Sequence, residues 1–183
     1  MKRIVFVRLL AVAFVSVFCT GLGAAETRGR VERVLDGDTV HVATATGRLT
    51  VRLGGIDAPE KSMPFGPEAR DSLAALVQGR EATVVHTAID RYGRTIGVLI
   101  VEGKDINAEM LRLGMAWVYR QYYRSGPYFD IEAEAKRERR GLWSQDNPMP
   151  PWLYRRSRRR PLGYSTETLH DDTHPNLVHE LGR

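Results

Sequence analysis

The chain has 183 residues, of which 43% are hydrophobic and 27% charged, and its formal net charge is +5 at pH 7. This length suits one domain with short additional segments, and the ordinary composition excludes a fibrous or low-complexity chain. Residues 1–25 carry three of the 27 basic side chains and no acidic one, so without them the net charge would be +2. Net charge therefore does not identify a nucleic-acid partner.

The first segment, residues 1–25, has the pattern of a secretory signal peptide. Lys2 and Arg3 precede an apolar run at 9–18, and small residues end the segment at Ala25. This order of basic, apolar and small residues predicts cleavage after Ala25 and export, either to the periplasm or out of the cell. An uncleaved membrane anchor is the alternative, but it needs about 20 apolar residues, and this run is shorter.

The only cysteine, Cys19, lies within this signal segment. The mature chain would then have no cysteine and no disulfide, which an oxidising compartment tolerates. We expect the mature protein to be a monomer without stable membrane association.

The central part of the chain, residues 26–153, is predicted to be a single domain. Its apolar patterns and turn residues predict two or three strands within 28–54, a helix from 66, strands near 82–88 and 94–101, and helices from 105 and over 128–139. This order predicts an α+β fold, a five-stranded OB-fold barrel with about three helices.

Residues 154–183 form an arginine-rich tail that has no apolar period. We expect the tail to be unstructured. Its basic run at 155–160 either tethers polyanions, substrate included, or has no specific role, and the sequence leaves both open.

Acidic residues gather at two predicted turns or strand ends. Asp36 and Asp38 lie in a DGDT motif that either forms only a hairpin turn or directs Asp38 at a cation. Asp57 and Glu60 follow another strand, in a loop that is either simply solvated or brings carboxylates beside Asp38. Oxygen ligands without nearby histidine or cysteine favour a hard cation, Ca²⁺ or Mg²⁺, over zinc.

Two arginines accompany these acids. Arg52 alternates with Val51 and Leu53, so it faces away from them, and Arg94 begins a strand. Each could be an ordinary solvated or ion-paired arginine. Beside a bound cation, however, planar guanidinium groups match the nonbridging oxygens of a phosphodiester.

Together these motifs resemble the thermonuclease, or micrococcal-nuclease-like, family. The DGDT motif, the strand arginine, a D-x-P-E loop and a D-[KR]-Y-G-R motif follow in the family's order at 36–39, 52, 57–60 and 90–94. Residues 66–69 and 142–144 match as well, so the resemblance covers roughly residues 28–147.

The resemblance implies a Ca²⁺-dependent nuclease that cleaves DNA and RNA and leaves 3′-phosphate ends. Asp38 and Asp57 would bind Ca²⁺ through carboxylates, and Ala58 would do so through its backbone carbonyl. The family's best-known member has Thr at the Ala58 position, which puts a hydrogen bond from that hydroxyl in doubt. Glu60 would hold the attacking water, with a general-base role as a further implication.

The resemblance also implies how substrate is held. Arg52 and Arg94 would clamp the phosphate, and Arg91 and Tyr92 would contact the nucleotide, with single-stranded regions preferred. The loop from 60 to 66 is shorter than in the best-known member, which removes a basic flap.

An aromatic segment near residue 120 does not match the family in register. It leaves open whether Tyr119, Tyr122 or Tyr123 stacks on a base, whereas Trp117 is expected in the core.

Two other functions fit parts of the pattern. One is a nucleic-acid-binding OB module without catalysis, and the other is an exported domain that binds Ca²⁺ only for stability. The full acidic set and the arginine pair are present together, which favours the nuclease.

Overall fold

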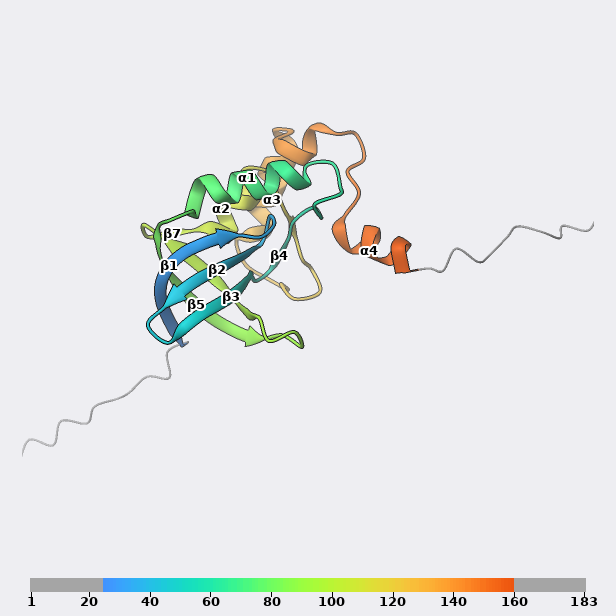
Figure 1. Cartoon of the computed structure of the whole chain (residues 1–183). Coiled ribbons are helices and arrows are strands. Elements are labelled where there is room, and N and C mark those ends of the chain that lie inside the picture. Colours follow the sequence, from blue (N-terminus) through green and yellow to red (C-terminus); the bar gives the residue numbers. More distant parts are fainter. Residues whose placement is uncertain (1–24, 160–183) are drawn as a thin grey trace, which may run out of the picture.

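The computed structural model describes residues 25–159 of the chain (Figure 1). Most of the predicted signal segment, residues 1–24, and the end of the predicted tail, residues 160–183, lie outside the described part. In chain order the elements are β1 (Glu26–Val34), β2 (Thr39–Thr44), β3 (Gly47–Leu53), β4 (Ile56–Asp57), α1 (Gly66–Val77), β5 (Glu81–Ile89), β6 (Thr95–Val101), β7 (Lys104–Asp105), α2 (Ile106–Arg112), β8 (Trp117–Val118), α3 (Tyr128–Arg137), a 3₁₀ turn (Gly141–Ser144) and α4 (Pro151–Arg159).

The five long strands close into a barrel. β1, β2 and β3 form an antiparallel meander, and β5 and β6 form a hairpin whose first strand pairs with β1. The barrel closes where β3 runs parallel to β6, with Val51 opposite Thr95 and Arg52 opposite Ile96. This arrangement confirms the α+β class and the five-stranded OB-fold barrel.

The two-residue period of the strands separates the core from the functional surface. In β3, Val51 and Leu53 are fully buried, and Arg52 between them faces outward. Strand β6 alternates in the same way, with Leu99 and Val101 in the core. Because successive side chains of a strand point to opposite faces, this pattern fixes which residues reach the outside of the barrel.

The helices α1, α2 and α3 gather on one side of the barrel (Figure 1). In α1, Ala69, Leu73 and Val77 recur every four residues and are fully buried, so one face of the helix packs inward. Pro67 lies in the first turn, where the missing N–H has no intrahelical partner to lose. None of the helices within residues 25–159 is long and apolar enough to cross a membrane.

A buried amide, Asn107, joins α2 to the turn before β4. Its Nδ2 donates to the backbone carbonyls of Gly54, at 2.9 Å, and Gly97, at 3.1 Å, and its Oδ1 accepts from the amide of Leu99 at 3.2 Å. Each polar atom of this buried side chain is paired, as buried amides require. Asn107 therefore holds the chain in place just before it reaches Asp57.

The structure differs from the sequence prediction at residues 154–159, which are helical instead of unstructured. They belong to α4, which makes four α-helices within residues 25–159 where about three were expected. The Trp152 ring stacks on Tyr119 at 5.8 Å between centroids, and the hydroxyls of Tyr154 and Ser62 are 2.8 Å apart. These tertiary contacts, which local apolar periodicity does not reveal, hold α4 against the domain.

Candidate active site

Two aspartates that are distant in sequence meet beside the barrel. Asp38 directly precedes β2, where Thr39 pairs with Arg52 of β3, and Asp57 ends β4, where it pairs with Trp117 of β8. The Asp38 carboxylate accepts a hydrogen bond from the Ala58 amide at 2.8 Å. Asp38 is 7% exposed and Asp57 is fully buried. We call Asp38 and Asp57 the carboxylate pair.

Arg52 lies between the two carboxylates and is itself almost buried, with 13% of its side chain exposed. Its Nη2 is 2.8 Å from Asp57 Oδ1 and 3.1 Å from Asp38 Oδ2. Its Nη1 donates to the backbone carbonyls of Leu53 and Ile56 at 2.9 and 3.0 Å. Four acceptors therefore fix this guanidinium before any substrate binds.

Acidic groups at this site repel each other. Burial raises the pKa of the Asp57 carboxyl, and Asp38 adds to the rise, although Arg155 and Arg52 oppose it. Burial and the neighbouring charge of Asp38 also raise the pKa of Asp36 to about 6, even though Asp36 accepts a hydrogen bond from the Asp38 amide. An added cation would relieve this repulsion.

The donor set fits a hard divalent cation. Both members of the carboxylate pair offer oxygen, and Ala58, which directly follows Asp57, lies beside Asp38 through its backbone amide. Within residues 25–159, no three side chains of His, Cys, Asp or Glu come close enough together to hold a metal ion by themselves. Ala58 carbonyl and water oxygens would therefore complete the coordination of an ion on Asp38 and Asp57.

Glu60 lies on the loop that follows β4, close to the carboxylate pair. Its side chain is 40% exposed, so water reaches the carboxylate. The loop turns back tightly, because a Cβ on Gly66 would come within 2.1 Å of the Glu60 carbonyl oxygen. Only glycine fits at position 66, and the short loop predicted from the sequence depends on it.

Arg94 is held by a different acid on the loop between β5 and β6. Asp90 Oδ2 accepts from Arg94 Nε at 2.8 Å and is 2.7 Å from Nη2, while its Oδ1 accepts from the amides of Tyr92 and Arg94. Although burial raises the pKa of the Asp90 carboxyl, these hydrogen bonds outweigh it and leave the pKa below its ordinary value. The loop is therefore ordered around a charged Asp90.

Arg91 and Tyr92 lie at the exposed tip of this loop. Tyr92 is 66% exposed, and the Arg91 and Arg94 guanidinium carbons lie 4.9 and 5.6 Å from its ring centroid. Arg91 also donates to the Tyr92 hydroxyl at 2.8 Å. A flat ring flanked by two cations suits a nucleotide, whose base can stack while its phosphate pairs.

The structure brings some of the predicted site residues together and leaves others apart. Four of them are in direct contact: Asp38, Arg52, Asp57 and Ala58. Glu60 is joined to them through Arg155, which bonds both Glu60 and Asp57. Among the described contacts, Arg94 binds Asp90 and no member of this group.

The strand register nevertheless relates Arg94 to Arg52. Ile96 pairs with Arg52 across the parallel strands, and residue 94 is two positions from Ile96. Arg94 therefore directly precedes the part of β6 that runs beside Arg52 of β3.

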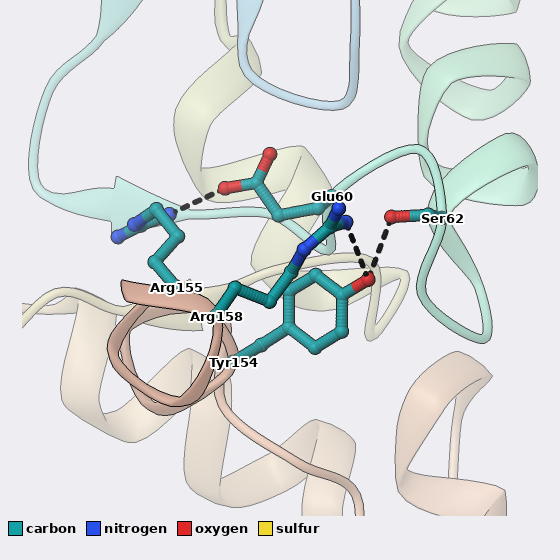
Figure 2. Close-up of a pocket in the computed structure, with 5 residues that line it drawn as sticks. All are labelled: Glu60, Ser62, Tyr154, Arg155 and Arg158. Atoms are coloured by element: carbon teal, nitrogen blue, oxygen red, sulfur yellow. Dashed lines mark hydrogen bonds and ion pairs between the residues drawn. The ribbon is translucent and has the colours of Figure 1, made fainter. Parts of the chain in front are cut away.

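Sequence reasoning missed Arg155 of α4. Its Nη2 is 2.8 Å from Asp57 Oδ2, and its Nη1 is 2.8 Å from Glu60 Oε1. Figure 2 shows it beside Glu60 in a shallow pocket that is also lined by Ser62, Tyr154 and Arg158. The sequence signal for this contact is Trp152, an apolar residue three positions before Arg155.

The aromatic segment has one exposed ring. Trp117 is 6% exposed and packs edge-on against Trp143, as expected for a core residue. Tyr123 stacks on Tyr128 at 4.4 Å between centroids, and Tyr119 is covered by α4. Tyr122 is 67% exposed, so it is the ring of this segment that is most open to a ligand.

Known proteins share this sequence pattern. The family model described as staphylococcal nuclease homologue matches residues 50–145. A micrococcal nuclease of Shigella flexneri is 42% identical over 161 residues, which cover 81% of this chain and 92% of that protein. An uncharacterized endonuclease of Escherichia coli O157:H7 is 41% identical over 140 residues, which cover 76% of this chain and 92% of that protein. With the barrel and the carboxylate site, these matches identify the chain as a member of the staphylococcal nuclease family and a hydrolytic nuclease.

Proposed function

We propose that this nuclease is an exported, calcium-dependent enzyme that hydrolyses phosphodiester bonds in DNA and RNA and leaves 3′-phosphate ends. The observation that carries the proposal is the carboxylate pair held by Arg52 beside Glu60, with Asp57 fully buried. A protein that only bound nucleic acid would have no use for acids in a surface that must attract phosphate.

The choice of calcium rests on the ligands. Asp38, Asp57 and the Ala58 carbonyl offer only oxygen, and few of the ligands come from side chains. Ca²⁺ accepts six to eight oxygens in flexible geometry, whereas Mg²⁺ demands a near-ideal octahedron. The ion would supply Lewis-acid stabilisation of the phosphate oxygens.

The protein's own groups account for the rest of the reaction. The Glu60 carboxylate, open to solvent, would take a proton from water as the water oxygen bonds to phosphorus. The bond from phosphorus to the 5′ oxygen then breaks, this oxygen takes up a proton from solvent to become a hydroxyl, and the phosphate stays on the 3′ side. Arg52 and Arg94 would donate to the nonbridging oxygens, where negative charge builds up.

Substrate contacts beyond the scissile phosphate favour unpaired nucleotides. Tyr92 and Tyr122 are the most exposed aromatic rings of the described residues, and each can stack on a base only where the base face is accessible. Arg91 beside Tyr92 would pair with a neighbouring phosphate. Single-stranded DNA and RNA should therefore be cut faster than duplexes. All the residues invoked belong to one chain, so a monomer suffices.

Export rests on the sequence of residues 1–25, with its basic, apolar and small-residue regions. Mass determination of the mature protein from its source cells would test it. A mature N-terminus at Glu26 in a secreted or periplasmic fraction supports export, and an intact N-terminus in the membrane fraction contradicts it.

The enzymatic proposal is tested by digestion of single-stranded and duplex DNA and RNA with the mature protein. We expect cleavage with Ca²⁺, little with Mg²⁺ and none in EGTA, with 3′-phosphate ends identified by mass spectrometry. Full activity in EGTA would contradict the cation dependence, and 5′-phosphate ends would contradict the proposed bond cleavage.

A further inference from the structure

Helix α4 is attached to the active-site loop by specific contacts. Trp152 stacks on Tyr119 with the ring planes 5° apart, and the Tyr154 hydroxyl lies 2.8 Å from the Ser62 hydroxyl. Arg155 follows and reaches Asp57. Three successive features of one short helix therefore fix its position over the loop that carries the acids, as Figure 2 shows for Tyr154 and Arg155.

Arg155 occupies the oxygens that a metal ion would need. Its Nη2 donates to Asp57 Oδ2 at 2.8 Å, and its Nη1 donates to Asp57 Oδ1 at 3.2 Å and to Glu60 Oε1 at 2.8 Å. Arg52 also donates a hydrogen bond to Asp57 Oδ1. Both oxygens of the buried Asp57 are thus bonded to guanidinium groups, and Oδ2 is bonded to Arg155.

We propose that Arg155 is an internal cation of the active site and that α4 is a latch, which must undock before a divalent cation binds Asp57. The inference rests on the proposed function, whose cation site it regulates. A guanidinium and a divalent cation repel each other, so Arg155 and the ion compete for Asp57 Oδ2. Binding of one therefore disfavours the other, and by linkage each weakens the other by the same factor.

The position of α4 allows it to detach. It stands apart from the barrel, joined by the segment after the 3₁₀ turn (Figure 1). Leu153 is 47% exposed, and α4 contributes no residue to the hydrophobic core cluster. Undocking therefore leaves the hydrophobic core cluster unchanged, and it replaces the ion pairs of Arg155 and the stacking of Trp152 with solvent. It also uncovers Tyr119, which α4 otherwise stacks upon.

The latch is tested by calorimetric titration of the full mature chain with Ca²⁺ alone. Arg155→Ala removes the internal cation, so we expect it to bind Ca²⁺ between about 5-fold and 150-fold more tightly than wild type, the usual range of coupling between sites. Arg156→Ala is the matched control, because it removes the same charge from the exposed neighbour on the same helix. Its Ca²⁺ affinity should stay within about twofold of wild type.

A second variant and a second measurement distinguish undocking of α4 from a simple loss of the Arg155 charge beside Asp57. Trp152→Ala loosens α4 without touching the carboxylates, and it should also tighten Ca²⁺ binding. Hydrogen exchange of residues 151–159 in wild type should accelerate when Ca²⁺ is added, because undocking exposes the helix.

Three results would overturn the latch. Equal Ca²⁺ affinities of Arg155→Ala and wild type, with Ca²⁺-dependent cleavage intact, contradict the latch and leave the proposed function standing. Unchanged Ca²⁺ affinity with a raised KM for DNA would make Arg155 a substrate contact instead. Failure of wild type and every variant to bind Ca²⁺ or to cleave contradicts the calcium enzyme and the latch together.

Discussion

Arg52 lies in β3 and Arg94 on the loop that leads into the neighbouring strand β6, and their surroundings differ. Arg52 is 13% exposed and tied to two carboxylates and two carbonyls, whereas Arg94 is 32% exposed and tied to one loop aspartate. In the proposed mechanism, Arg52 belongs to the cation site and is in place before substrate arrives. Arg94 would exchange Asp90 for a phosphate, so the two arginines would contribute at different stages of catalysis.

Asp57→Asn should have the largest effect on cleavage activity, because it removes a negative charge from the carboxylate pair that Arg52 holds in place. Asparagine has nearly the same size and shape as aspartate, and its side-chain oxygen can still accept a hydrogen bond from Arg52, so we expect the variant to fold. A Lewis-acid cation is worth several kcal/mol in the transition state, which corresponds to a loss of about a thousandfold or more in kcat/KM. Cleavage kinetics at saturating Ca²⁺ measure the loss. A variant with more than a tenth of wild-type activity would remove Asp57 from the mechanism.

Arg94→Lys tests the loop between β5 and β6, because only catalysis needs a guanidinium at position 94. Lysine keeps the charge but loses the planar fork, so kcat should fall by roughly 10²–10³. Binding of single-stranded DNA should change by no more than about threefold. Arg91→Lys on the same loop is the control and should retain kcat. Near wild-type turnover by a folded Arg94→Lys protein would contradict the role assigned to Arg94 in the transition state.

Asp90→Asn sharpens the claim that Arg94 is held until substrate arrives. Asparagine can still accept from the two loop amides, but it competes less with phosphate for Arg94. Partly exposed ion pairs are worth up to about 1 kcal/mol, so KM should fall by up to about fivefold with kcat within about twofold. Steady-state kinetics would distinguish the alternative, in which a tenfold lower kcat shows that Asp90 positions Arg94 for the reaction.

Asp36→Asn should give the smallest effect, on stability in the cation-free state. Burial and Asp38 raise the Asp36 pKa to about 6, so the contribution of Asp36 to stability is present below its ordinary pKa and is lost as the pH rises through about 6. Asparagine can accept the same amide hydrogen bond without this loss. In EGTA, the variant should therefore gain in Tm over wild type as the pH rises from about 4 to about 7. A constant difference in Tm would contradict this account.

Local sequence patterns predicted most of the barrel. Alternation placed Val51 and Leu53 inside and Arg52 outside, and the structure confirms both. The proximity of Asp57 to Asp38 was one of two alternatives that the strand ends left open, and the structure shows both carboxylates bonded to Arg52. These features depend on the alternation of apolar residues and on turn residues within a few positions, and both can be read directly from the sequence.

Sequence patterns did not predict the long-range contacts. The partner of Arg155 lies 98 residues away, and no period in the tail marks the helix that carries it. The pairing of Arg94 with Asp90 was also missed, because a motif names residues without saying which acid an arginine binds at rest. Asn107, whose amide fixes the turn before β4, looked like any polar helix residue.

The central claim, that a cation on the carboxylate pair drives hydrolysis, is tested most directly by measuring Ca²⁺ occupancy and cleavage rate in the same solutions. The account predicts one Ca²⁺ per molecule in the active state and a rate that rises in proportion to occupancy, because Asp57 and Asp38 act only with the ion bound. A cleavage rate that stays constant while Ca²⁺ occupancy falls to zero would contradict it.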